Sequence, residues 1–90
     1  MYFDNSVVDT ATEKFNNLYA SHKNEVDEHI KEVKESGDFK DLETRLAWDI
    51  ARAANYLDWM PKGPDGYISG NDSHITTVFK KALRNSNIEY

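Results

Sequence analysis

The stretch DFKDLETRLAWDIARAANYLDWMP, residues 38–61, decides the fold expected of this chain. Its apolar residues recur at helical spacing, so they form one continuous face along a helix. That expected core face consists of Leu42, Leu46, Ile50, Ala53, Leu57 and Met60. Asp38 can cap the start of the helix with its carboxylate, and Pro61 ends it because proline lacks the amide hydrogen that a helix interior needs. The sequence therefore predicts a helix from Asp38 to Met60.

A second helix is predicted on each side of this stretch. Gly37 suits the left-handed end of a preceding helix that begins near Ser6 and ends at Ser36. An apolar stripe of unbroken phase follows that helix, at Val8, Ala11, Phe15, Leu18, Tyr19, Val26, Ile30 and Val33. The weak helix formers in residues 21–24 could interrupt it, but the unbroken phase favours one helix. After a connector at 61–72, residues 71–73 are preferred caps for a third helix over 73–85.

These elements predict a single all-α domain over residues 1–90. We expect a long antiparallel helical hairpin plus a short third helix, with helices at about 6–36, 38–60 and 73–85. A helix of about 30 residues is roughly 45 Å long, which exceeds what a monomer of this size needs. Part of its stripe is therefore expected to pack on another subunit, which would make the protein a homodimer.

Composition excludes several classes of function. The net charge of −5 disfavours sequence-independent binding to nucleic acid or to an anionic membrane. The absence of cysteine excludes disulfides, thiolate zinc sites and a cysteine nucleophile. No apolar run reaches the length of a membrane span, and the first residues lack a signal-peptide pattern. We therefore expect a soluble, cytoplasmic protein. Three basic residues lie near the end of the third predicted helix, at Lys80, Lys81 and Arg84. Positive charge at this end complements the helix dipole, so direct binding to nucleic acid is not expected.

The connector PKGPDGYISGND, residues 61–72, raises the possibility of a calcium site. Its centre, residues 65–69, resembles the second half of an EF-hand loop. The resemblance implies that Gly66 makes the turn, Tyr67 supplies a carbonyl ligand and Asp72 replaces the usual glutamate. However, Pro61 and Gly63 occupy ligand positions without a side-chain oxygen. The apolar residues that follow are also displaced by two positions, which turns the outgoing helix by about 200°.

The connector is therefore interpreted as a turn fixed by proline and glycine, with Tyr67 and Ile68 packed on the helices. A degenerate EF-hand-like calcium site stays as an alternative. So does a zinc site at His22, Glu25 and His29, which lie on neighbouring helical turns. The same histidines border the apolar stripe, where packing is the commoner role. No known catalytic motif is present, and we expect neither enzyme activity nor a metal or cofactor.

The helix predicted over 38–60 carries a second stripe, roughly opposite its core face. It consists of Trp48, Arg52, Asn55 and Trp59. Tryptophan and arginine often dominate protein interfaces, so the stripe is a candidate partner-binding surface. The alternative is a central helix that is buried on both sides.

Two acidic features complete the candidate sites. Asp49 falls on the core side of its helix and needs partners, for which Arg45, Arg52, a tyrosine hydroxyl or backbone amides could serve. We interpret it as a structural clamp. A separate acidic run consists of Glu25, Asp27, Glu28, Glu32 and Glu35. This run is either a solvated helix face or a surface that mimics nucleic acid in a basic groove.

The function expected from these features is protein binding without enzyme activity. A small acidic helical protein of this kind would act as a stoichiometric inhibitor or adaptor. By compositional analogy, one example is a virus-encoded antagonist of a host defence protein or a nucleic-acid enzyme. The alternatives are the nucleic-acid mimic and the metal-binding protein described above.

Overall fold

The computed structural model describes residues 5–37, 41–68 and 71–90. These residues form five helices and no strand. The helices are α1 (Asn5–Ser21), α2 (Lys23–Ser36), α3 (Leu42–Ala53), α4 (Tyr56–Trp59) and α5 (Asp72–Asn85). The all-α fold class is confirmed, whereas the expected long hairpin with a short third helix is not.

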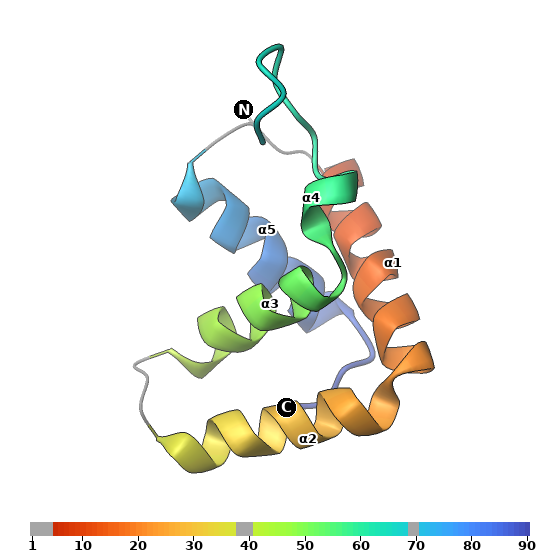
Figure 1. The fold of residues 1–90 in the computed structure, drawn as a ribbon, viewed down its shortest axis with the longest axis vertical. Coiled ribbons are helices and arrows are strands. Elements are labelled where there is room, and N and C mark those ends of the chain that lie inside the picture. The colour runs from red at the N-terminus through yellow and green to blue at the C-terminus, as the bar shows by residue number, and fades with distance from the viewer. Residues whose placement is uncertain (1–4, 38–40, 69–70) are drawn as a thin grey trace.

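Helix α5 joins the other elements because it packs against both α1 and α3. In Figure 1, α1 descends along one side and α2 crosses the bottom, while α3 runs above α2 in the opposite direction. Each long helix buries residues at a spacing of three or four, as an amphipathic helix does. The buried set is Ala11, Phe15, Val26, Ile30, Val33, Leu46, Ala47, Ile50, Ala51, Met60, Ile75, Val78, Phe79, Ala82, Leu83 and Ile88.

The helix predicted over 6–36 is two helices, so the prediction of a continuous helix is wrong. The chain bends at His22, whose backbone angles are φ −134° and ψ 40°. Hydrogen bonds continue on both sides, because the His22 amide bonds to Leu18 and its carbonyl accepts from Val26. The bend therefore costs few bonds and hardly shifts the phase of the apolar stripe, which is why periodicity did not reveal it. It turns α2 away from the direction of α1, so that α2 runs beneath α3 (Figure 1).

The helix predicted over 38–60 also differs from the structure. Its expected start at Asp38 lies outside the described residues, and the observed cap is Asp41, whose carboxylate accepts from the Thr44 amide at 3.2 Å. Helix α3 ends at Ala53, and Asn55 then adopts a left-handed conformation with φ 61° before α4 begins. This break changes which side chains face the core.

Two members of the expected core face are exposed in the structure. Ala53 is exposed, and the Leu57 side chain is 54% exposed. Trp59 and Tyr56 pack against the core instead, and Met60 is buried as expected. The face predicted from an uninterrupted period of 3.6 is therefore correct at Leu42, Leu46, Ile50 and Met60 and wrong at Ala53 and Leu57.

The predictions for helix ends were more accurate elsewhere. Gly37 ends α2 in the left-handed conformation, with φ 62°. Asn71 caps α5 by accepting a hydrogen bond from the His74 amide at 3.0 Å. The third helix was predicted over 73–85 and is observed over Asp72–Asn85.

The connector after Met60 forms a tight turn. Lys62 and Ile68 pair as an isolated antiparallel bridge, and the Gly63 amide donates to the Tyr67 carbonyl at 2.8 Å. Gly66 has φ 84°, which favours glycine because an L side chain is strained there. Ile68 packs against the core as expected, but Tyr67 is 76% exposed, so the expectation that it packs on the helices is wrong.

The segment after α5 folds back over the molecule. Ile88 is buried in the core, and the Asn87 amide donates to the Asn16 side chain in α1 at 2.7 Å. The Tyr90 hydroxyl donates to Glu43 in α3 at 2.7 Å. This segment therefore ties α1 and α3 together.

Candidate protein-binding groove

Asp49, in the second half of α3, is the centre of a cluster of polar side chains. Its side chain is only 15% exposed and contacts three cationic or potentially cationic groups. His29 Nε2 and Arg45 Nε each lie 2.8 Å from Oδ2, and Arg52 Nη1 lies 3.1 Å from Oδ1. The two arginines were among the partners expected from the sequence. His29 was not, because it comes from α2, 20 positions away, and only the folded chain brings it close.

Opposing effects set the charge state of Asp49. Burial raises the pKa of the carboxyl, but the hydrogen bonds with Arg45 and His29, together with the positive charge of Arg45, outweigh burial. The net result is a pKa below the ordinary value. Asp49 is therefore ionised at neutral pH and links α2 to α3 through His29.

An apolar groove opens beside this cluster, where the end of α1 meets α2 and α3. Its volume is about 470 Å³. The floor is formed by Leu18, Val26, Ile50 and Ala53. The rim is polar and consists of His22, Glu25, His29, Asp49 and Arg52. We call this the α2–α3 groove.

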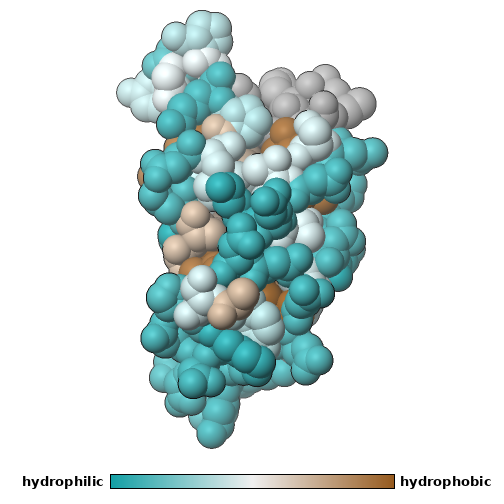
Figure 2. Space-filling model, turned by 90° about the vertical axis from the view of Figure 1, so that its right-hand side faces the viewer, coloured by the Kyte–Doolittle hydropathy of each residue, from teal (hydrophilic) through white to brown (hydrophobic). Residues whose placement is uncertain are grey.

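The rim of the groove is hydrophilic, since it consists of two histidines, two carboxylates and one arginine. Figure 2 shows small hydrophobic areas enclosed by hydrophilic side chains on the face that it draws. Such a limited apolar area inside a polar rim is typical of a site that receives a few side chains of a partner.

The predicted stripe of Trp48, Arg52, Asn55 and Trp59 is divided by the break after α3. Trp48 and Trp59 both turn toward Phe79 of α5, with ring centroids 5.0 and 6.3 Å away. The indole of Trp48 donates to Thr76 at 2.9 Å, and that of Trp59 donates to the Ala54 carbonyl at 3.0 Å. Both tryptophans are therefore partly buried against the core.

The other two residues of the stripe stay at the surface. Arg52 lies over the Trp48 ring, 5.5 Å from its centroid, and its side chain is 62% exposed. Asn55 is exposed, and its amide donates to the Asp58 carboxylate within the α3–α4 break. Arg52 is thus the member of the stripe that lines the groove. Asn55 instead bonds to Asp58 within the α3–α4 break.

The acidic residues of α2 have different surroundings. Asp27 accepts from Tyr19 at 2.8 Å and from Lys23 at 2.9 Å, and these bonds lower the pKa of its carboxyl. Glu25 lies 2.8 Å from His22. Glu28 and Glu32 are exposed beside His29, and neither forms an ion pair with another described residue. Glu35 is exposed near the end of the helix.

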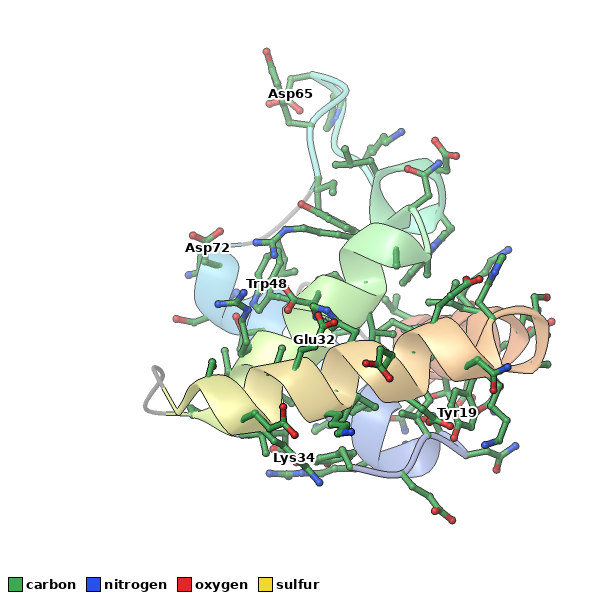
Figure 3. The ribbon with its side chains drawn as sticks, turned by 60° about the horizontal axis from the view of Figure 1, so that its bottom comes forward. Tyr19, Glu32, Lys34, Trp48, Asp65 and Asp72 are labelled. Carbon is green, nitrogen blue, oxygen red and sulfur yellow. The ribbon has the colours of Figure 1, made fainter. Side chains whose placement is uncertain are left out.

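The structure offers little support for the metal sites considered from the sequence. No three His, Asp or Glu side chains within residues 5–37, 41–68 and 71–90 are placed to hold a metal ion. The Tyr67 carbonyl already accepts from Gly63, and Asp65 accepts from the Tyr67 amide at 3.0 Å. In Figure 3, Asp65 lies at the tip of the connector and Asp72 lies apart from it, at the start of α5.

The basic residues at the end of α5 are engaged with α3. Arg84 donates to both oxygens of Glu43, at 2.6 and 2.9 Å, and Lys80 lies 3.5 Å from Asp41. The hydrogen bonds from Arg84 and Tyr90 lower the pKa of Glu43. These contacts between helices were not predicted from the sequence. They give Lys80 and Arg84 a structural role in addition to any interaction with the helix dipole.

Comparison of the chain with protein-family models, with curated proteins and with solved structures found no match. Among the described residues, no helix combines the length and the apolar character needed to cross a membrane.

Proposed function

We propose that the protein is a small non-enzymatic binding module, an inhibitor or adaptor, and that its partner protein inserts apolar side chains into the α2–α3 groove. The observation that supports this proposal is the apolar floor, which is open to solvent beside the Asp49 cluster. An apolar floor inside a polar rim is an arrangement in which a protein interface can receive side chains of a partner. Ala53 matters most here, because it is an exposed apolar residue on the floor of the groove.

The rim favours a protein as the ligand. Arg52 is held at the edge of the groove by Asp49 and by the Trp48 ring. A guanidinium positioned on an aromatic ring is a frequent energetic centre of protein interfaces, because it contributes both contact area and directed hydrogen bonds. The groove is open along one side, whereas a small-molecule pocket normally encloses most of its ligand.

The substitution Ala53→Arg tests this proposal. The longer charged side chain would fill the groove from an exposed position, so partner binding should fall at least about tenfold while the fold persists. The matched control is Ala20→Arg, an exposed alanine of α1 that does not line the groove. Both variants and the unmodified protein would be used to capture partners from the source cell. A partner retained equally by all three would contradict the proposed site.

The nucleic-acid mimic is a second candidate, supported by the exposed Glu28 and Glu32. The same capture experiment separates it from the groove. A partner that survives Ala53→Arg but is lost with Glu28→Lys plus Glu32→Lys, and whose binding weakens steeply with salt, would favour the acidic surface.

A further inference from the structure

A second hollow adjoins the α2–α3 groove on the exposed side of α2. Its volume is about 570 Å³, and it is lined by Asn24, Glu25, Glu28, His29 and Glu32. Glu25 and His29 line both hollows, so the apolar groove and the second hollow meet along α2. We call the second one the acidic hollow, because three of its five lining residues are carboxylates.

The carboxylates of the acidic hollow lack basic partners within the described residues. Glu25 contacts only the imidazole of His22 among the described ion pairs, and Glu28 and Glu32 have none. Glu28 and Glu32 are four positions apart, where two like charges on a helix repel each other. Lys31 lies three positions after Glu28 but forms no ion pair with it. The repulsion within the hollow is therefore not relieved by a described ion pair.

The other lysines of α2 do not reach the acidic hollow. Figure 3 shows Glu32 and Lys34 on different sides of the helix. Lys23 pairs with Asp27 at 2.9 Å. Neither lysine lines the groove or the acidic hollow. The negative charge of the hollow is therefore open to a ligand from outside.

Arg52 carries the one permanent positive charge in the lining of the groove. Its Nη1 lies 3.1 Å from the Asp49 carboxylate, which balances that charge, and its guanidinium lies over the Trp48 ring. Because a guanidinium has five N–H groups, further donors remain that can bind backbone carbonyl oxygens of a peptide. This arrangement favours a peptide chain as the ligand over a small organic cation.

We infer that the occupant of the groove is a basic segment of the partner protein, in which lysine or arginine side chains stand beside an apolar anchor. The anchor lies on the floor of the α2–α3 groove, and the basic side chains pair with Glu25, Glu28 and Glu32. This inference rests on the proposed function and adds the chemistry of the partner. The groove and the acidic hollow then form one binding surface.

The contact between His29 and Asp49 holds the two hollows in a fixed relation. His29 lines both of them, and its Nε2 lies 2.8 Å from Oδ2 of Asp49, which joins α2 to α3. Val26 and Ile30 anchor α2 in the core. The carboxylates are therefore placed beside the apolar floor before a partner arrives, and such preorganisation lowers the cost of binding.

Three synthetic peptides of equal length test this inference. One contains leucines beside lysines, the second replaces each lysine by glutamate, and the third keeps the lysines and replaces each leucine by serine. Binding is measured by fluorescence anisotropy in about 0.15 M salt, where attraction to the overall negative charge of the protein is screened. The leucine–lysine peptide should bind at least about tenfold more tightly than either of the others.

Removing charge from the acidic hollow should weaken this peptide. Glu28→Gln with Glu32→Gln should reduce its affinity about tenfold. Because the two substitutions also remove a repulsion, the urea midpoint should not fall, whereas loss of a structural contact would lower it. The matched control is Asp9→Asn with Glu13→Gln, which removes the same charge from exposed positions of α1 and should change affinity less than about twofold.

Four results would overturn the inference. The first is equal or tighter binding of the glutamate peptide, and the second is equal binding of the serine–lysine peptide, which would need no apolar anchor. The third is an equal loss of affinity in the α1 control, because net charge alone would then explain binding. The fourth is a concentration-dependent dimer that Ala53→Arg abolishes, because a second copy would then occupy the groove.

The proposed function fails separately from this inference. If none of the three peptides binds, the inference is wrong. Capture of the natural partner that still depends on Ala53 would then leave the proposed function standing, with an occupant of different chemistry. Capture that depends on neither Ala53 nor the acidic hollow would contradict both.

Discussion

Asp49 shows how one residue combines burial with charge. A carboxylate that is only 15% exposed would be costly without partners, and three side chains satisfy it. Two of the three were predictable, because Arg45 and Arg52 lie four and three positions away on the same helix. The contact with His29 was not predictable, since it depends on how α2 is placed.

Replacing Asp49 by alanine should lower the free energy of unfolding by about 1–3 kcal/mol, because the charged hydrogen bonds are lost and cationic groups are left close together. The matched control is Asp9→Ala on the exposed surface of α1, which should change stability by less than about 0.5 kcal/mol. Urea unfolding measures both variants. An unfolding midpoint for Asp49→Ala equal to that of the unmodified protein would contradict the clamp.

The difference in stability between the unmodified protein and Asp49→Ala should depend on pH. The folded pKa of Asp49 lies below its ordinary value of 3.8, so its carboxylate stabilises the fold above that value. This contribution is lost as pH falls through the folded pKa. The stability difference between the unmodified protein and Asp49→Ala should therefore be full near neutral pH and should narrow below about pH 4.

At the scale of the helices, the residues that cap or end a helix could be predicted from the sequence. The breaks within the two long predicted helices could not. Gly37 and Asn71 act where their residue types suggested, because left-handed backbone and capping are local properties. The bend at His22 hardly changes which face of the chain is buried, whereas the break near Asn55 exposes Leu57 and turns Tyr56 and Trp59 to the core. The apolar period of the sequence runs through both places, so periodicity revealed neither. Tertiary packing decides them, because each bend brings a second set of apolar residues onto the same core.

The break at Asn55 yields a prediction. Asparagine tolerates the left-handed conformation better than alanine does, and its side chain also bonds to Asp58. Asn55→Ala should destabilise the protein by about 1–2 kcal/mol, and Asn55→Gly by clearly less, because glycine adopts this conformation freely. Urea unfolding of the pair is the measurement. An alanine variant as stable as the glycine variant would indicate that the helix continues through residue 55.

At the scale of the whole molecule, the core converges on Phe79. Its ring is fully buried and contacts aromatic side chains from α1, α3 and α4. The ring centroids of Phe15, Trp48, Tyr56 and Trp59 lie between 5.0 and 6.3 Å from it. The sequence placed Phe79 on the apolar face of its helix, but its central position follows from α5 packing between α1 and α3, which no local pattern encodes.

Phe79→Ala should therefore cost about 3–5 kcal/mol, a large share of the roughly 5–15 kcal/mol that stabilises a typical domain. Emission of Trp48 and Trp59 should shift to longer wavelength, since both rings lose a neighbour. Tyr67→Ala is the matched control, because that aromatic ring is 76% exposed. Comparable destabilisation by both variants would contradict the central role of Phe79.

The contact between the first and last helices has a consequence for synthesis of the protein. The Asn16–Asn87 hydrogen bond joins residues 71 positions apart, and Phe15 meets Phe79 in the same region. A ribosome adds about 5–20 residues per second, so α1 leaves the exit tunnel several seconds before α5 does. During that interval Phe15 has no core to enter. The nascent chain must carry an uncovered apolar stripe, which makes this stage the one at which a chaperone would bind.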